Sequence, residues 1–248
     1  MKIKDIKEIV LSGLKPFADE HGFKINKGRF SLISKRYDYQ ILIHFTYITC
    51  GFNVELFPYI DIKFNTVHNI CEQNGFDLNY TAFINLFMLE EIHKHGWYNG
   101  LRNQMLKSNT DRVNLTEYKE TFEYLREEYP LAKDRIICTE HAGWIERCND
   151  RIMELMPYAL DYIEKYSTIE AIDRLYNTLP INRYDPNCSS IVHHCMIGII
   201  SAKLAHNPQY DELKQIYYSI MEKDNILEEY KQTFLKIIDY LDSTYPCL

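Results

Sequence analysis

The stretch CSSIVHHCMIG, residues 188 to 198, combines residue types that bind metals or act as nucleophiles. Cys188 and Cys195 stand on either side of His193 and His194, and thiolate and imidazole groups are common ligands of zinc. Each residue of a helix turns by about 100°, so the two cysteines share a face while the histidines point away from them. No four-ligand cluster closes within the segment, and apolar residues surround the helix on almost every side, as in buried helices. We therefore predict a core helix here, with no metal ligands.

Two other segments carry a histidine and a glutamate at ligand spacing. Glu90 and His93 form an E-x-x-H motif, but ferritin-like dimetal sites need this motif twice, with carboxylates from two further helices. The sequence has no second copy. His68 and Glu72, four residues apart, could supply two ligands, which do not make a site. We predict that both pairs lie on solvated helix faces, and we expect no cofactor.

An acidic-x-lysine pair, Asp61 and Lys63, lies on a predicted strand, with Glu55 on the same face and Asp38 in the preceding hairpin. Magnesium-dependent nucleases use carboxylates to hold the metal and a lysine to assist the attacking water. The pair is short enough to occur on any half-exposed strand. The acidic balance of the chain also argues against a phosphodiester substrate, because binding to phosphates depends largely on basic side chains.

A second candidate for enzymatic chemistry is His141, which lies between acidic Glu140 and Glu146 and close to Trp144. A histidine with an acidic neighbour can act as a general base, but no G-x-S-x-G nucleophile motif accompanies it. Phosphate-binding loops of the G-x-G-x-x-G and G-x-x-x-x-G-K-[ST] types are also missing from the sequence. We predict no catalytic residues. A hydrolase or metal-dependent nuclease that uses Asp61/Lys63 or His141 is the alternative.

Hydrophobic periodicity predicts the elements that position these residues. Apolar residues at helical spacing between residues 3 and 17 predict an amphipathic first helix. The period then changes to two in residues 39–47 and 54–64, and two shorter segments before them bring the total to about four strands. From Thr66 onward the patterns are helical, including a helix that begins at Thr81. The sequence predicts an α+β fold: an N-terminal helix plus a small antiparallel sheet of about four strands, followed by a helical C-terminal half.

The length of 248 residues fits a single α+β domain, 1–248, with a potential boundary between a helix-and-sheet part, 1–110, and a helical part, 111–248. Seven scattered cysteines without a C-x-x-C pair are typical of free thiols in a reducing compartment. No apolar run has the length of a membrane span, and the first residues lack the pattern of a signal peptide. We expect a cytoplasmic protein that does not enter the membrane.

Charge is distributed unevenly along the chain. The net charge is −7, yet residues 1 to 36 hold nine Lys/Arg against four Asp/Glu, so the rest carries −12. An acidic surface makes nucleic acid an unexpected partner and would suit a basic partner protein.

Two segments of the chain resemble a family of bacterial proteins of unknown function. Its members begin with an LKP…GF-K-K-G-F segment and later carry a proline, a hydrophobic helix and S/T-L-E. The matching residues here are Leu14, Lys15, Pro16, Gly22, Phe23, Lys24, Lys27, Gly28 and Phe30, then Pro157, Ser167, Thr168, Ile169 and Glu170. The resemblance implies no catalytic residues. Some comparable small bacterial proteins are immunity proteins against secreted toxins, so it favours a binding module.

These patterns lead to one functional hypothesis. We expect a non-enzymatic protein-interaction module, of the immunity-inhibitor type, that binds a basic toxin domain through an acidic helical surface. Aromatic residues are common anchors in such contacts, and Trp97, Tyr98 and Trp144, beside glycines and polar turns, are the candidate binding residues. The alternative is that both tryptophans pack in the core.

Overall fold

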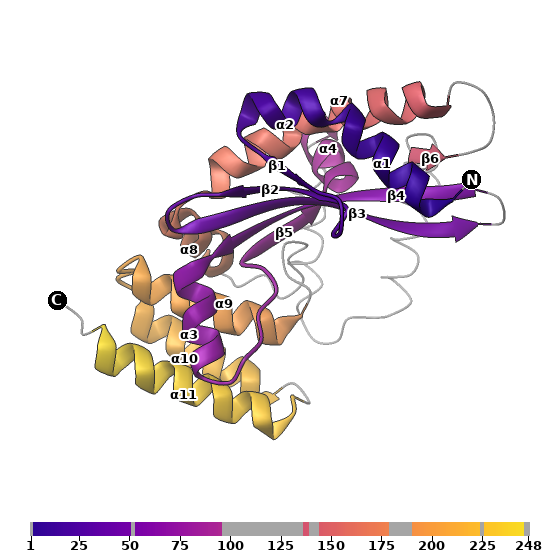
Figure 1. Ribbon diagram of the computed structural model, residues 1–248. Helices are drawn as coiled ribbons and strands as arrows, with labels where there is room; N and C mark the ends of the chain where they lie inside the picture. The colour runs from indigo at the N-terminus through magenta and orange to yellow at the C-terminus, as the bar shows by residue number, and fades with distance from the viewer. Residues whose placement is uncertain are drawn as a thin grey trace. The chain divides into compact units, whose positions relative to one another are not determined.

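The computed structural model describes residues 2–50, 53–95, 136–138, 144–178, 190–223 and 226–245. These residues form two compact units (Figure 1). Unit 1 consists of Met1–Ile33, Ile43–Ile60 and Asn85–Leu160, and unit 2 consists of Ser34–Leu42, Asp61–Ile84 and Asp161–Leu248. The predicted boundary at residue 110 lies outside the described residues and stays a prediction.

The order of elements confirms the α+β class. An N-terminal helical pair is followed by most of the strands, and the C-terminal part is helical. In chain order the elements are α1 (Ile3–Gly13), α2 (Lys15–His21), β1 (Lys24–Asn26), β2 (Ser31–Lys35), β3 (Tyr39–Cys50), β4 (Asn53–Phe64), α3 (Asn65–Gln73), β5 (Ala82–Asn85), α4 (Leu86–His95), β6 (Ile136–Cys138), α7 (Trp144–Tyr166), α8 (Ile169–Asn177), α9 (Ile191–Leu204), α10 (Tyr210–Lys223) and α11 (Glu228–Thr244).

The strands form one antiparallel sheet in the order β1-β2-β3-β4-β5, with β6 paired to β4. Lys24 lies opposite Ile33 at the β1–β2 edge, and Val54 lies opposite Cys138 where β6 joins β4. In β4 the even positions Val54, Leu56, Ile60, Ile62 and Phe64 are buried, which confirms the face predicted from the period of two.

The prediction of about four strands was too low, and the helix predicted to begin at Thr81 begins later. Ala82 and Ile84 are buried, whereas Phe83 and Asn85 are half-buried, so β5 has the strand period. The Thr81 N–H donates to the Ile62 carbonyl of β4 at 2.8 Å. This pairing depends on a neighbouring strand that is distant in sequence, and a local pattern does not report it.

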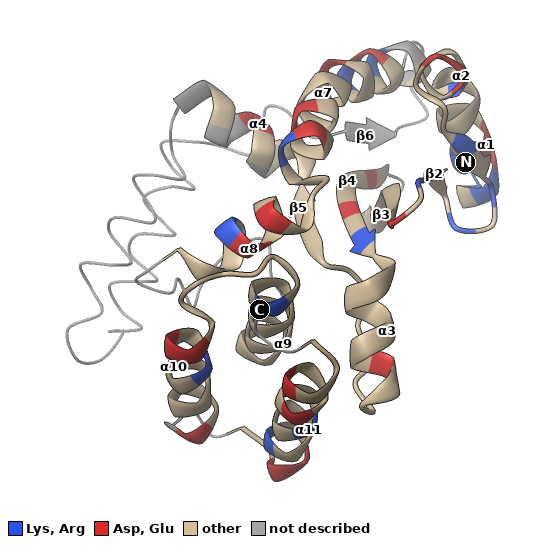
Figure 2. Cartoon of the chain, turned by 90° about the vertical axis from the view of Figure 1, so that its left-hand side faces the viewer, with Lys and Arg blue, Asp and Glu red and all other residues tan. Residues whose placement is uncertain are grey.

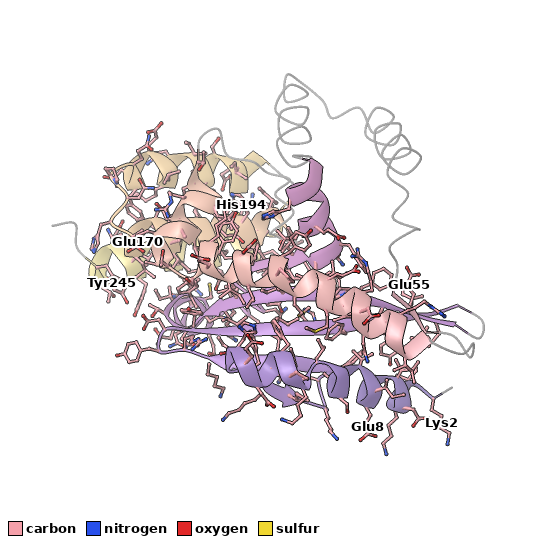
Figure 3. The ribbon with its side chains drawn as sticks, turned by 90° about the horizontal axis from the view of Figure 1, so that it is seen from above. Lys2, Glu8, Glu55, Glu170, His194 and Tyr245 are labelled. Atoms are coloured by element: carbon pink, nitrogen blue, oxygen red, sulfur yellow. The ribbon has the colours of Figure 1, made fainter. Side chains whose placement is uncertain are left out.

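In unit 1, α1, α2 and α7 lie along one face of the strands (Figure 1). Pro16 divides the predicted first helix, because α1 ends at Gly13 and α2 begins at Lys15. The apolar face of α1 is buried through Ile6, Val10 and Leu11. On the outer side, Lys2 and Glu8 extend away from the helix (Figure 3). The carboxylate of Glu8 forms an ion pair with the ammonium of Lys27 at 3.2 Å.

In unit 2, helix α9 is packed against α3, α8, α10 and α11. Its residues from His194 to Lys203 are all buried, which confirms the prediction of a core helix. A helix that is covered on several sides needs apolar residues all round rather than one apolar stripe. No helix among the described residues is both long and apolar enough to cross a membrane.

Candidate functional site

The histidines of the opening stretch make structural contacts. Ser190 caps α9, with its hydroxyl accepting from the His193 N–H at 3.2 Å, and it lies 2.6 Å from Nδ1 of the same residue. His194 lies inside the helical unit (Figure 3) and its Nε2 contacts the Tyr176 carbonyl at 3.1 Å. Cys195 is fully buried, and Cys188 lies outside the described residues.

The two histidine–glutamate pairs are not both solvated, contrary to prediction. Glu90 is buried and forms a two-bond ion pair with Arg151 of α7, whose Nη1 donates to Oε1 at 3.0 Å and Nη2 to Oε2. His93 is exposed and its ring packs beside Tyr158. A carboxylate that already accepts both bonds of a guanidinium has a structural role.

His68 is the second correction, because it is buried while Glu72, on the same helix, is exposed. Burial, together with the positive charge of Lys63, lowers the pKa of His68 to about 3. Its Nε2 has no hydrogen-bond partner within the described part of the chain. The sequence pattern missed this burial because a histidine on an amphipathic helix is compatible with either face.

The residues of the predicted nuclease pattern on β4 lie near opposite ends of the strand. Asp61 and Lys63 are half-buried near the end of the strand, and Glu55 is buried near its start. Six residues of extended chain correspond to about 20 Å, which is too far for two carboxylates to share a metal ion. The carbonyl of Asp38 accepts a hydrogen bond from the Asn65 N–H at 2.9 Å. Among the described residues, no group of three or more His, Cys, Asp or Glu is placed to hold a metal ion.

Three predicted positions lie outside the described residues: Trp97, Tyr98 and His141. Trp144 begins α7, but its side chain is also outside the described part. The predicted anchors and the predicted general base therefore stay predictions.

A buried polar network joins α8, α9 and α10. The carboxylate of Asp173 accepts a hydrogen bond from Asn177 Nδ2 at 2.6 Å, and Asn207 Nδ2 donates to its Oδ1 at 3.1 Å and its Oδ2 at 2.9 Å. The second N–H of Asn177 donates to the Gly198 carbonyl at 2.9 Å, and the Tyr217 hydroxyl donates to Asn177 Oδ1 at 2.6 Å. Because each of these polar groups has partners, the network stabilises one arrangement of the helices.

A second polar cluster lies where α9, α10 and α11 meet. The carboxylate of Asp242 accepts from Lys203 at 3.1 Å, from Tyr210 at 3.0 Å and from Lys214 at 3.0 Å. Partial burial raises the pKa of Asp242, but these hydrogen bonds have the larger combined effect and lower it. The ammonium of Lys203 also lies 4.3 Å from the ring centroid of Tyr210. Lys203 and Lys214 therefore share one carboxylate, that of Asp242.

The outer faces of α10 and α11 carry more acids than bases, although Lys214 pairs with Asp211 at 3.3 Å and Lys231 pairs with Glu222 at 3.9 Å. Lys203, Lys214 and Lys231 have side-chain exposures of 6%, 24% and 19%. Acidic residues are distributed along both helices in Figure 2. The exposed charged residues of the two helices are Asp211, Glu212, Glu222, Glu228, Glu229, Asp239 and Asp242, with one exposed lysine among the described side chains, Lys236.

Each of these helices also exposes a large apolar side chain among its acids. Tyr218 of α10 is 44% exposed and shares a helix face with Asp211 and Glu222, seven residues before it and four after it. Leu235 of α11 is 36% exposed and shares a face with Glu228 and Asp239 at the same spacings. We refer to Tyr218, Leu235 and the exposed acids of α10 and α11 as the acidic face.

Tyr218 and Leu235 were missed in the sequence analysis, although a signal was present. In α10, Tyr210, Leu213, Tyr217 and Met221 share the buried face, and Tyr218 falls outside it. Separating the two faces by helical spacing would have identified an apolar residue on the outer side.

Comparisons with known proteins give no relatives: no protein-family model, no curated protein and no solved structure matches the chain. The resemblance to a bacterial family of unknown function therefore stays an interpretation of the sequence.

Proposed function

We propose that the chain is a non-enzymatic protein-interaction module, of the immunity-inhibitor type, that holds a basic toxin domain against the acidic face. The observation that carries this proposal is the excess of exposed carboxylates over exposed lysines on α10 and α11. Exposed carboxylates steer a basic partner during association. Tyr218 and Leu235 supply apolar area that a partner can bury.

The energetic roles of the two kinds of residue differ. Exposed charges are screened by salt and contribute mainly to the association rate. Apolar anchors that become fully buried contribute mainly to the lifetime of the complex, and truncating one costs about 1–2 kcal/mol or more. The two sets of variants should therefore change different rate constants.

The experiment begins with the full chain immobilised and a lysate of the native host passed over it. A captured protein counts only if it is basic and if charge reversal on the acidic face, Asp211→Lys with Glu222→Lys, weakens its binding. The matched control is Glu20→Lys, because Glu20 is exposed on α2, which belongs to unit 1. Gene neighbourhood is an independent test, since a toxin gene next to this one supports the proposal.

Rate measurements on the purified pair then separate steering from anchoring. We expect the association rate to fall at least about tenfold between 50 and 500 mM salt. We expect Tyr218→Ala and Leu235→Ala to raise the dissociation rate, while Tyr37→Ala, a change at a fully exposed tyrosine elsewhere, leaves it unchanged. A salt-independent rate, or an acidic partner, would refute the electrostatic part of the proposal.

The same proposal places the protein in the cytoplasm. Cys71 is a free, buried thiol, which suits a reducing compartment. The alternative of a hydrolase or metal-dependent nuclease rests on Asp61, Lys63 and His141, and nothing in the described residues favours it.

A further inference from the structure

The connection between α3 and β5, residues 74–81, contacts two histidines that resist protonation. The first is His68 of α3, which is 6% exposed and hydrogen-bonds the backbone of Leu78 in the connection. Lys63 of β4 is the charged group that faces it, and its positive charge adds to the cost of a second cation. Burial and Lys63 therefore hold His68 in its neutral form, although the hydrogen bond to the backbone of Leu78 raises its pKa.

The second histidine is His193, in the first turn of α9. Its ring lies edge-on to Phe76 at 5.2 Å and stacks with Tyr80 at 6.2 Å, both in the connection. Burial lowers the pKa of His193, although the negative charge of Asp77 works in the opposite direction. Ser190, 2.6 Å from Nδ1, is the polar group on its own helix. The aromatic contacts thus require an imidazole that is at least partly desolvated.

We propose that residues 74–81 form an acid-sensitive connection, which separates from His68 and His193 when the pH falls and so lets both rings take up a proton in water. The backbone bonds that would break are the Phe76 N–H to the Cys71 carbonyl, at 2.9 Å, and the Thr81 N–H to the Ile62 carbonyl, at 2.8 Å.

The direction of the effect follows from proton linkage. A histidine whose pKa is lower in the closed state takes up its proton preferentially in the open state, so acid favours opening. Above the ordinary pKa of 6.5 both states are neutral and the effect disappears. Between pH 7.5 and pH 5.0, with a pKa of about 3 when closed, His68 alone multiplies the opening equilibrium by about 30. His193 multiplies it further.

Opening also affects the acidic face, because Tyr230 of α11 packs edge-on against Phe76 at 6.1 Å. Tyr230 directly follows Glu228 and Glu229, two of the acids of that face. Loss of the Phe76 contact would loosen the first turn of α11 and weaken partner binding at acid pH. This consequence rests on the proposed function, whereas the opening itself does not.

Hydrogen exchange of the full chain without a partner tests the opening. The measured quantities are the protection factors of the Phe76 and Thr81 amides at pH 7.5 and 5.0, with the amides of Ile199 and Ile200 in α9 as references. We expect protection in the connection to fall at least about 30-fold, and much more than protection in α9. In His68→Leu the loss of protection between pH 7.5 and pH 5.0 should be about 30-fold smaller than in wild type. In His193→Gln this loss should be reduced by a smaller factor. His206→Asn is the matched control, because His206 is exposed and Asn tolerates its positive φ of 53°.

Two results would overturn the inference. One is an equal fall in wild type and His68→Leu, which would mean that His68 does not govern the opening. The other is an equal fall in the connection and in α9, which would mean global unfolding instead of local opening. If the opening is seen but no basic partner exists, the proposed function fails and the acid-sensitive connection stands.

Discussion

Replacing Gly198 with alanine tests the close packing of α9 against α10. A Cβ at this position would lie 2.2 Å from the Tyr217 hydroxyl oxygen, 2.6 Å from Cζ and 3.0 Å from Cε2. Tyr217 is fully buried, and its hydroxyl donates to Asn177 Oδ1. The Tyr217 ring cannot move away without losing its hydrogen bond to Asn177. The added methyl group therefore either pushes α9 and α10 apart or disrupts the polar network.

The cost of Gly198→Ala can be estimated from its parts. Overpacking of a filled core costs about 1–3 kcal/mol, and a broken buried hydrogen bond that leaves Asn177 unsatisfied costs about 1–3 kcal/mol more. Alanine is the better helix former by about 1 kcal/mol. We therefore expect the free energy of unfolding to fall by about 1–5 kcal/mol.

Urea denaturation followed by circular dichroism measures this change. Gly28→Ala is the matched control, because a Cβ there would meet its nearest neighbour, Asn26 Oδ1, at an ordinary 3.5 Å. In a Tyr217→Leu background the obstructing atoms are gone, and Gly198→Ala should become neutral or slightly stabilising. An unchanged midpoint for Gly198→Ala alone, or the same loss in both backgrounds, would refute the reasoning.

Two further predictions concern the two units separately. In unit 1, Arg151→Met leaves the buried Glu90 carboxylate without its guanidinium and should cost about 3–5 kcal/mol in urea denaturation, whereas Arg151→Met with Glu90→Leu should recover most of the loss; equal stability of the single and double variants would contradict this. In unit 2, Ile199→Asp places a charge at a fully buried position of α9 and should cost about 3 kcal/mol or more. A soluble Ile199→Asp variant with an unchanged melting temperature would show that α9 is not the core of the unit.

Part of the candidate site could be predicted from the sequence, namely its charge and its helical setting. The excess of acids after residue 36 indicated an acidic helical surface, and the acids of α10 and α11 are indeed exposed. Which lysines neutralise them is a tertiary matter. Lys203 reaches Asp242 on a helix 39 residues away, and no local spacing indicates such a pair.

The sequence by itself determined the elements whose periodicity is strong. Alternation identified the buried face of β4, and the continuous apolar surface of residues 191–204 identified α9 as a core helix. Local sequence is sufficient in these cases because the period of the apolar residues reports which face loses contact with water.

Only the tertiary structure decided the features that depend on distant partners. Residues 82–85 became a strand because β4 offered an edge to pair with, and Glu90 became buried because Arg151, 61 residues later, accompanies it. Gly198 is required by the Tyr217 ring, which belongs to another helix. In each case the free energy comes from a hydrogen bond, an ion pair or a steric contact between segments that the sequence separates, so local propensity carries no record of it.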